Sequence, residues 1–234
     1  MREKDKLKLR LYIIRHGESA SNAGLTDGMS DELKADPPLS EKGRDQARLL
    51  GEYFSGLRLD AIYSSGLRRA CATGGEIALR QSKDGAKTVR VHGIFTECGT
   101  GEDTRGRLIG EIAEEFPPCV CAPGQSETEQ VIFYGADDTD EMLLDRAKKA
   151  VDYLLGLHHG GETVAVMAHA AFDTFMLYAA LGLGSEQIFD PKFYNTGITR
   201  VDFMETGTGS FGDVHLVYHN AAPHLIEKYP VFRY

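Results

Sequence analysis

The chain has 234 residues, of which 42% are hydrophobic and 26% are charged, and its formal net charge at pH 7 is −9. This acidic balance argues against nucleic acid or an anionic membrane surface as the main partner, because both attract basic proteins. No apolar run approaches the roughly 20 residues that span a bilayer, and the charged start, MREKDKLKLR, lacks the apolar stretch of a signal peptide, so we expect a cytoplasmic protein with no membrane partner.

Strand-like and helix-like segments alternate along the chain. The first strand candidate, Leu9–Ile14, precedes a helical stretch for which Ser40 has the residue type of an N-cap. Helices are also predicted in GLRRACATGGEIALRQ, DTDEMLLDRAKKAVDYLLGLHHGG and AAFDTFMLYAALGLG. The other strand candidates are Ala61–Ser64, Val89–Phe95, Thr163–Ala168, Ile198–Phe203 and Val214–Tyr218. This alternation is typical of an α/β fold with a mostly parallel sheet.

The segment of residues 99–140 interrupts the alternation. It is rich in Gly, Pro and acidic residues and contains one short helical piece, RLIGEIAEEF. Because it is too long for a plain connection, we interpret it as a small cap inserted over one end of the sheet. The sequence therefore predicts one domain over residues 1–234, a three-layer α/β/α sandwich with this cap.

The four cysteines are too few for a disulfide framework in a chain of this length. Cys119 and Cys121 are two residues apart, but no second pair with ligand spacing follows them. We interpret all four cysteines, which include Cys71 and Cys98, as reduced structural thiols, and we expect no bound metal.

Cationic residues follow three of the predicted strands. LRLYII leads into Arg15 and His16, ETVAVMA leads into His169, and DAIYSS leads into Arg68 and Arg69 at a helix start. Ligands of open α/β sheets bind beyond the carboxyl ends of the strands. Helix N-termini and guanidinium groups both bind phosphate oxygens. The sequence thus predicts a pocket for inorganic phosphate or for the phosphoryl group of a small substrate.

These segments resemble the histidine phosphatase superfamily, the phosphoglycerate-mutase-like proteins. RHGES followed by Asn22 is similar to the family signature, and SSGLRRACATG is similar to its second motif. Further matches follow in order in DPPLSEKGRDQA, FTECG, VAVMAHAAF, YNTGITRV and YHNAAPHL. RHG alone would be a weak signal, whereas ordered matches over nearly the whole chain are a strong one.

The resemblance implies roles for six residues. His16 would be the nucleophile, and Glu97 would donate a proton to the leaving oxygen. The group that holds the phosphoryl oxygens would consist of Arg15, Asn22, Arg69 and His169. A histidine nucleophile needs an unprotonated ring nitrogen, which is available near pH 7, and Glu97 must carry a proton when it acts. No step of such a reaction requires a metal or a cofactor.

Departures from the family pattern favour hydrolysis over mutase activity. Ala170 and Ala171 follow the second histidine where the family usually has glycine, and Gly66 stands where it usually has proline. The chain has no tryptophan, and Glu97 lacks the arginine and tyrosine that follow it in the mutases of the family. We therefore expect a metal-independent phosphomonoesterase. The alternatives are a phosphoglycerate mutase and a non-catalytic phospholigand-binding protein, and the sequence predicts neither the substrate nor the oligomeric state.

Several other polar residues are interpreted as structural. His158 and His159 end a predicted helix, where the helix dipole accounts for them. Asp36 is interpreted as part of a solvated face, and His224 as either a packing or a functional residue. We expect Gly17 to let the backbone turn close to the phosphate.

Overall fold

The computed structural model of the chain describes residues 6–99, 105–132, 138–186, 189–207 and 212–229. The strand order of its main sheet is β5-β3-β2-β7-β1-β8-β9. The first five of these run parallel, whereas β8 is antiparallel to both β1 and β9. The strands are β1 (Leu7–Arg15), β2 (Ala61–Ser64), β3 (Val89–Val91), β5 (Cys119–Cys121), β7 (Glu162–Ala168), β8 (Ile198–Met204) and β9 (Val214–Ala221). The predicted α/β fold with a mostly parallel sheet is confirmed.

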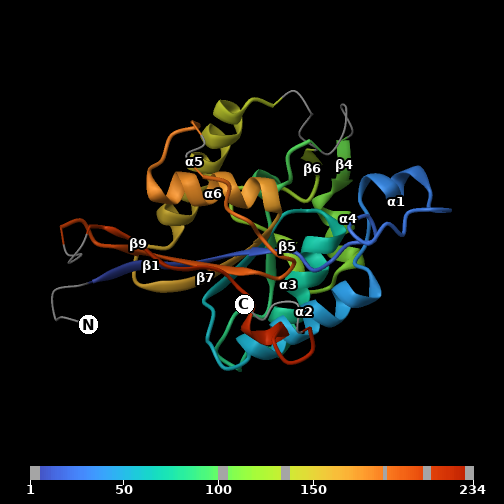
Figure 1. The fold of residues 1–234 in the computed structure, drawn as a ribbon, viewed down its shortest axis with the longest axis horizontal. Helices are drawn as coiled ribbons and strands as arrows, with labels where there is room; N and C mark the ends of the chain where they lie inside the picture. Colours follow the sequence, from blue (N-terminus) through green and yellow to red (C-terminus); the bar gives the residue numbers. More distant parts are fainter. Residues whose placement is uncertain (1–5, 100–104, 133–137, 187–188, 208–211, 230–234) are drawn as a thin grey trace.

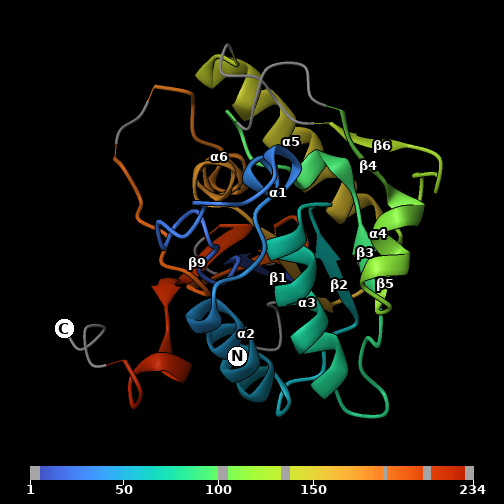
Figure 2. The same cartoon turned by 90° about the vertical axis from the view of Figure 1, so that its right-hand side faces the viewer.

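Helices cover both faces of this sheet, as Figures 1 and 2 show. α2 (Glu41–Phe54) and α3 (Arg68–Arg80) lie on one face, and α5 (Asp140–Leu157) and α6 (Ala170–Leu181) lie on the other. Among the helices of the described residues, none is long and apolar enough to cross a bilayer. The three-layer α/β/α arrangement is therefore confirmed as well.

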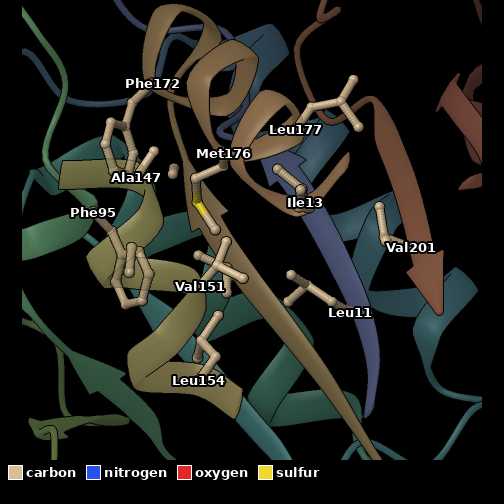
Figure 3. Packing of buried hydrophobic residues seen from close by; sticks show 14 of the residues in the cluster. Leu11, Ile13, Phe95, Ala147, Val151, Leu154, Phe172, Met176, Leu177 and Val201 are labelled. Atoms are coloured by element: carbon tan, nitrogen blue, oxygen red, sulfur yellow. The ribbon is translucent and has the colours of Figure 1, made fainter. Parts of the chain in front are cut away.

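The alternation of side chains along β1 builds a separate core on each face. Leu11 and Ile13 point toward α5 and α6 and pack with Met176 (Figure 3). Tyr12 and Ile14 belong to the core on the side of α2 and α3. Since successive strand residues face opposite sides, an unbroken apolar run predicts a central strand that is buried on both faces.

One predicted strand ends earlier than expected, whereas one predicted helix start is confirmed. The strand predicted over Val89–Phe95 ends at Val91, because His92 caps a 3-10 helix, η1 (Gly93–Phe95), by accepting a hydrogen bond from the N–H of Ile94 at its Nδ1. The predicted N-cap of α2 is confirmed, since the Oγ of Ser40 accepts from the N–H of Gly43 at 3.0 Å.

The described part of residues 99–140, the segment predicted to be a cap, contributes elements outside the main sheet. It contains β4 (Arg105–Leu108), α4 (Ile109–Glu115) and β6 (Gln130–Ile132), and β4 pairs with β6 away from the main sheet. In Figure 1 these elements lie at the same end of the molecule as α1 (Asp31–Ala35). β5, in the same segment, instead extends the main sheet beside β3. Sequence analysis missed β5 because three residues are too few to show a period.

Gly66 lies where the cap packs on the turn between β2 and α3. A Cβ atom at this position would lie 2.2 Å from Cγ2 of Val131 in β6. The glycine therefore lets the cap approach the turn, and the proline that the family usually carries here would collide with Val131.

Gly17 and Gly43 bring the end of β1 against the first turn of α2. A Cβ on Gly17 would lie 2.6 Å from the carbonyl oxygen of Gly43, and a Cβ on Gly43 would lie 1.9 Å from the carbonyl oxygen of Glu18. The missing side chain of Gly17 therefore serves the contact with α2. The expectation that Gly17 lets the backbone turn close to the phosphate stays a prediction.

Candidate active site

The carboxyl ends of β1, β2 and β7 bring the predicted site residues together. Arg15 lies beside Ala168 in the register of β1 and β7, and the backbone N–H of His16 donates to the carbonyl of Ala168 at 3.1 Å. The rings of His16 and His169 have their centroids 5.0 Å apart. A cavity of about 290 Å³ adjoins them, and its lining includes Arg15, His16, Asn22, Arg69 and Glu97. His169 is not among the residues that line this cavity.

The hydrogen bonds of His16 select one neutral tautomer. Its Nδ1 lies 2.6 Å from the carbonyl oxygen of Gly17, which can only accept, so Nδ1 carries the hydrogen. Nε2 accepts from Nε of Arg69 at 3.1 Å. Burial, followed by the charges of Arg69 and Arg15, holds the pKa of His16 well below the usual 6.5. The ring therefore presents an unprotonated Nε2, the form that can act as a nucleophile.

Two buried guanidinium groups lie beside this nitrogen. Nη1 of Arg15 donates to the carbonyl of Phe193 at 2.7 Å, and Thr73 links the backbones of Gly17 and Arg69 through its hydroxyl. Within the described residues, Nε of Arg15 and Nη1 of Arg69 are buried without a hydrogen-bond partner. Burial lowers the pKa of both arginines, but a guanidinium stays protonated in proteins. Cations with unused donors make the cavity suited to an anion.

His169 is the N-cap of α6 and is fully buried. Its Nε2 lies 2.7 Å from the hydroxyl of Ser65, and its Nδ1 has no hydrogen-bond partner in the described part of the chain. Burial, Arg69 and His16 hold the pKa of His169 well below 6.5. The ring of His169, predicted to be cationic, is therefore neutral in the free site.

Glu97 reaches the N-terminus of α6 from the segment that follows η1. Its carboxylate accepts from the backbone N–H groups of Cys98 at 3.0 Å, Phe172 at 3.1 Å and Ala171 at 3.4 Å. Free N–H groups at a helix start bind carboxylates well. Glu97 is thus held at the cavity wall.

Asn22 is connected to the backbone around His16. Its Oδ1 accepts from the N–H of Ser19 at 3.2 Å and from Nδ2 of Asn195 at 3.3 Å, and the same Nδ2 lies 3.1 Å from the carbonyl oxygen of His16. Sequence analysis gave Asn195 no role, although the segment YNTGITRV pointed to it.

The interpretation of Asp36 as part of a solvated face is wrong, because only 6% of this residue is exposed. It accepts from the backbone N–H of Arg68 at 2.9 Å and forms ion pairs with Arg107 at 3.4 Å and with Arg69 at 3.8 Å. Burial raises the pKa of Asp36, and the three arginines oppose that shift. The side chain of Arg68 also pairs with Glu32 and Glu115, outside the cavity lining, so Arg69 is the arginine of the site.

Two other histidines take structural positions. His158 is the C-cap residue of α5, as predicted, and its Nε2 lies 2.9 Å from the hydroxyl of Tyr63. Burial lowers the pKa of His158. Nε2 of His224 lies 2.9 Å from the hydroxyl of Thr196, and burial lowers its pKa to about 4.

Further residues lie at or beside the cavity although the sequence did not single them out. Lys34, Ala35 and Pro37 line it from α1 and the following segment, and α1 has only five residues, too few to show a helical period. The four cysteines are free, and among the described residues no group of three or more His, Cys, Asp or Glu side chains is placed to hold a metal ion.

Comparison with known proteins connects this geometry to a family. The sequence model of the histidine phosphatase superfamily (branch 1) matches residues 11–210. The chain belongs to the histidine phosphatase superfamily. The predicted resemblance is thereby confirmed, and the relatives of this histidine phosphatase are enzymes.

Two relatives show the range of activities in the superfamily. Phosphoserine phosphatase 1 of Hydrogenobacter thermophilus is 31% identical over 200 residues, which cover 83% of this chain and 84% of that protein. A 2,3-bisphosphoglycerate-dependent phosphoglycerate mutase of Brucella anthropi is 30% identical over 200 residues, which cover 80% of this chain and 88% of that protein. The histidine phosphatase described here is thus similar to both a phosphatase and a mutase.

Solved structures of two phosphatases share its fold. Phosphoserine phosphatase of Entamoeba histolytica, in complex with 3-phosphoglyceric acid, is 21% identical with a TM-score of 0.60, over 93% of this chain and 99% of that one. A mycobacterial glucosyl-3-phosphoglycerate phosphatase in complex with VO3 is 24% identical with a TM-score of 0.61. The match covers 91% of this chain and 99% of that one.

Proposed function

We propose that this histidine phosphatase hydrolyses a small phosphorylated metabolite through a phosphohistidine on His16. The observation that carries the proposal is the neutral ring of His16, whose Nδ1–H is held by the carbonyl of Gly17 and whose Nε2 lies beside Arg69 in a cavity that Arg15 also lines. The similarity to a phosphoserine phosphatase over most of both chains supports hydrolysis.

In the first step, Nε2 of His16 attacks phosphorus while the bond to the leaving oxygen breaks. Negative charge on the equatorial oxygens is stabilised by Arg15, Arg69, His169 and Asn22. Glu97 gives its proton to the leaving oxygen, because an alkoxide leaves poorly without one. The hydrogen bond from Nδ1 to the carbonyl of Gly17 stabilises the positive ring of the phosphohistidine.

In the second step, water replaces His16 on phosphorus. The carboxylate of Glu97 accepts a proton from the attacking water, the bond between phosphorus and Nε2 breaks, and its electron pair returns to the ring. Inorganic phosphate leaves with Glu97 protonated again. The cations of the cavity are protein side chains, so this route needs no metal.

Phosphate release from phosphoserine, 3-phosphoglycerate and glucosyl-3-phosphoglycerate tests the activity. We expect free phosphate from at least one of these in the presence of EDTA, because the names of the relatives point to phosphorylated hydroxy acids and their derivatives. Incubation of 3-phosphoglycerate with a trace of 2,3-bisphosphoglycerate separates hydrolysis from isomerisation. Formation of 2-phosphoglycerate faster than free phosphate would show a mutase.

The protonation state of His16 is a separate prediction. Burial and the two arginines place its pKa below 6.5, so the ring gains a proton only as the pH falls well below that value, and the nucleophile stays unprotonated at pH 6. Nitrogen NMR of ¹⁵N-histidine-labelled protein, assigned with the His16→Ala variant, should show a neutral ring at pH 6 in the absence of phosphate. A ring that is half protonated at pH 6.5 or above would contradict the prediction.

A further inference from the structure

Asp36 is a buried acid that the proposed mechanism does not use, although it lies next to the cavity. Only 6% of it is exposed. Its chain neighbours Ala35 and Pro37 line the cavity, whereas Asp36 is not among the lining residues. A charged group is costly to bury unless it is paired and hydrogen-bonded, so the contacts of Asp36 must account for its burial.

The first of these contacts is with the start of α3. The N-cap residue of this helix, Leu67, makes no side-chain hydrogen bond to the first turn. Oδ1 of Asp36 instead accepts from the backbone N–H of Arg68, the first residue of α3, at 2.9 Å. An N–H group at a helix start binds side-chain oxygens well. An asparagine could make the same hydrogen bond, so this contact does not explain the charge of Asp36.

Three guanidinium groups surround the carboxylate and do require its charge. Nη2 of Arg107, in β4, donates to Oδ2 at 3.4 Å. Nε of Arg68 lies 3.7 Å from Oδ2, and Nη1 of Arg69 lies 3.8 Å from Oδ1. Because cations at these distances favour the charged form of a carboxyl group, Asp36 is ionised at neutral pH.

Of the three arginines, Arg69 is the one that depends on Asp36. The other two also form ion pairs with glutamates of α1 and α4. Among the residues that the structure describes, no other carboxylate lies within 4 Å of the guanidinium of Arg69. The second arginine of the cavity, Arg15, is held differently, because its Nη1 donates to the carbonyl of Phe193 at 2.7 Å. Asp36 is therefore the anchor of Arg69.

The guanidinium of Arg69 is held at two of its nitrogens. Its Nε donates to Nε2 of His16 at 3.1 Å, and its Nη1 faces Asp36. A guanidinium is planar and rigid, so contacts at two nitrogens fix the orientation of the whole group. Both members of the ion pair are buried. Removal of the carboxylate charge would leave the cation without its counter-ion, free to turn away from His16.

We propose that Asp36 is a positioning residue, which holds the guanidinium of Arg69 in the orientation that stabilises the phosphoryl group during transfer to His16. The inference rests on the proposed function. The negative charge of Asp36 weakens the attraction of the site for any anion, so its benefit lies in orientation and not in binding. Preorganised cations accelerate a reaction because they need no rearrangement when charge develops.

The Asp36→Asn variant tests the proposal, because asparagine keeps the hydrogen bond to α3 and removes the charge. We expect kcat, measured on the phosphate ester that wild type hydrolyses best, to fall about tenfold, since small misplacements of catalytic groups are costly. The inhibition constant of inorganic phosphate should stay within about twofold of wild type or decrease. A merely structural role would weaken both together.

The Asp27→Asn variant is the matched control. It makes the same change at an exposed position between β1 and α1, outside the cavity lining. Both kcat and the inhibition constant of phosphate should match those of wild type. For Asp36→Asn, an unchanged kcat, or a parallel loss of kcat and of phosphate affinity, would overturn the proposal.

A double-mutant cycle tests whether Asp36 acts through Arg69. In an Arg69→Gln background there is no guanidinium to orient, so Asp36→Asn should lower kcat no further. The same tenfold loss in both backgrounds would show that Asp36 acts independently of Arg69, against the proposal.

Nitrogen NMR of ¹⁵N-arginine-labelled wild type tests the anchor without a variant at Asp36. With Arg69 assigned by Arg69→Gln, its Nη1 and Nη2 should give separate signals in the absence of phosphate, because a held guanidinium does not rotate freely about its Nε–Cζ bond. One averaged signal would contradict the proposal. If wild type releases phosphate from no ester, the proposed function fails. If it does so and Asp36→Asn keeps its kcat, only this inference fails.

Discussion

Replacing His16 by alanine should abolish phosphate release, with kcat lowered by at least about 10³-fold. Alanine removes Nε2, the only atom in the proposed route that bonds to phosphorus before water does. The cations of Arg15 and Arg69 remain, so the variant should still bind inorganic phosphate or vanadate with affinity similar to that of wild type. The measurements are steady-state release of phosphate and calorimetric binding of the anion.

The His159→Ala variant is the matched control, because this exposed histidine follows the end of α5 and does not line the cavity. It should retain wild-type activity. Brief reaction of wild type with radiolabelled substrate should leave an acid-labile, base-stable label that His16→Ala does not acquire. Equal turnover in wild type and His16→Ala would instead indicate a non-catalytic phospholigand-binding protein.

Replacing Glu97 by glutamine should slow hydrolysis of alkyl phosphates by about 10²-fold or more, the usual contribution of general acid catalysis. Glutamine can still accept from the N–H groups of Ala171 and Phe172 through its carbonyl oxygen, so the loop keeps its anchor. It carries no transferable acidic proton, and poor leaving groups therefore suffer most. With p-nitrophenyl phosphate the phosphorylation step should change far less.

Comparison of the two substrates is the decisive readout for Glu97. Glu127→Gln, at an exposed position in the cap segment, is the matched control and should behave as wild type on both. An equal loss on alkyl and aryl phosphates would show that Glu97 only supports the structure. In that case another acid near the cavity would be the proton donor.

The sequence was sufficient to predict where His16 and its nearest cations lie. The apolar run before Arg15 predicted a strand buried on both faces, and the run before His169 predicted its neighbour in the sheet. Because the carboxyl ends of parallel strands share one edge, these residues had to meet there. Arg69 followed from the helix start after β2, and the structure places its Nε 3.1 Å from Nε2 of His16.

Contacts between segments that are far apart in the chain could not be predicted from the sequence. The pairing of Asp36 with Arg107 joins residues 71 positions apart, and neither residue lies in a periodic segment that would predict it. An acid in the first turn of a helix is common, because the dipole favours negative charge there, so the sequence gives no sign that Asp173 is buried. The structure shows that its side chain is fully buried.

The contact between Gly17 and Gly43 limits how the position of the nucleophile can evolve. Main chain meets main chain there, so no side chain can adjust by changing rotamer when the fit is disturbed. Any single substitution at either position adds a Cβ that must displace the strand end carrying His16, and a second change at the other glycine only enlarges the collision. Substitutions can therefore change the shape of the cap and of the cavity rim. Substitutions at Gly17 or Gly43 cannot move His16 gradually to a new position.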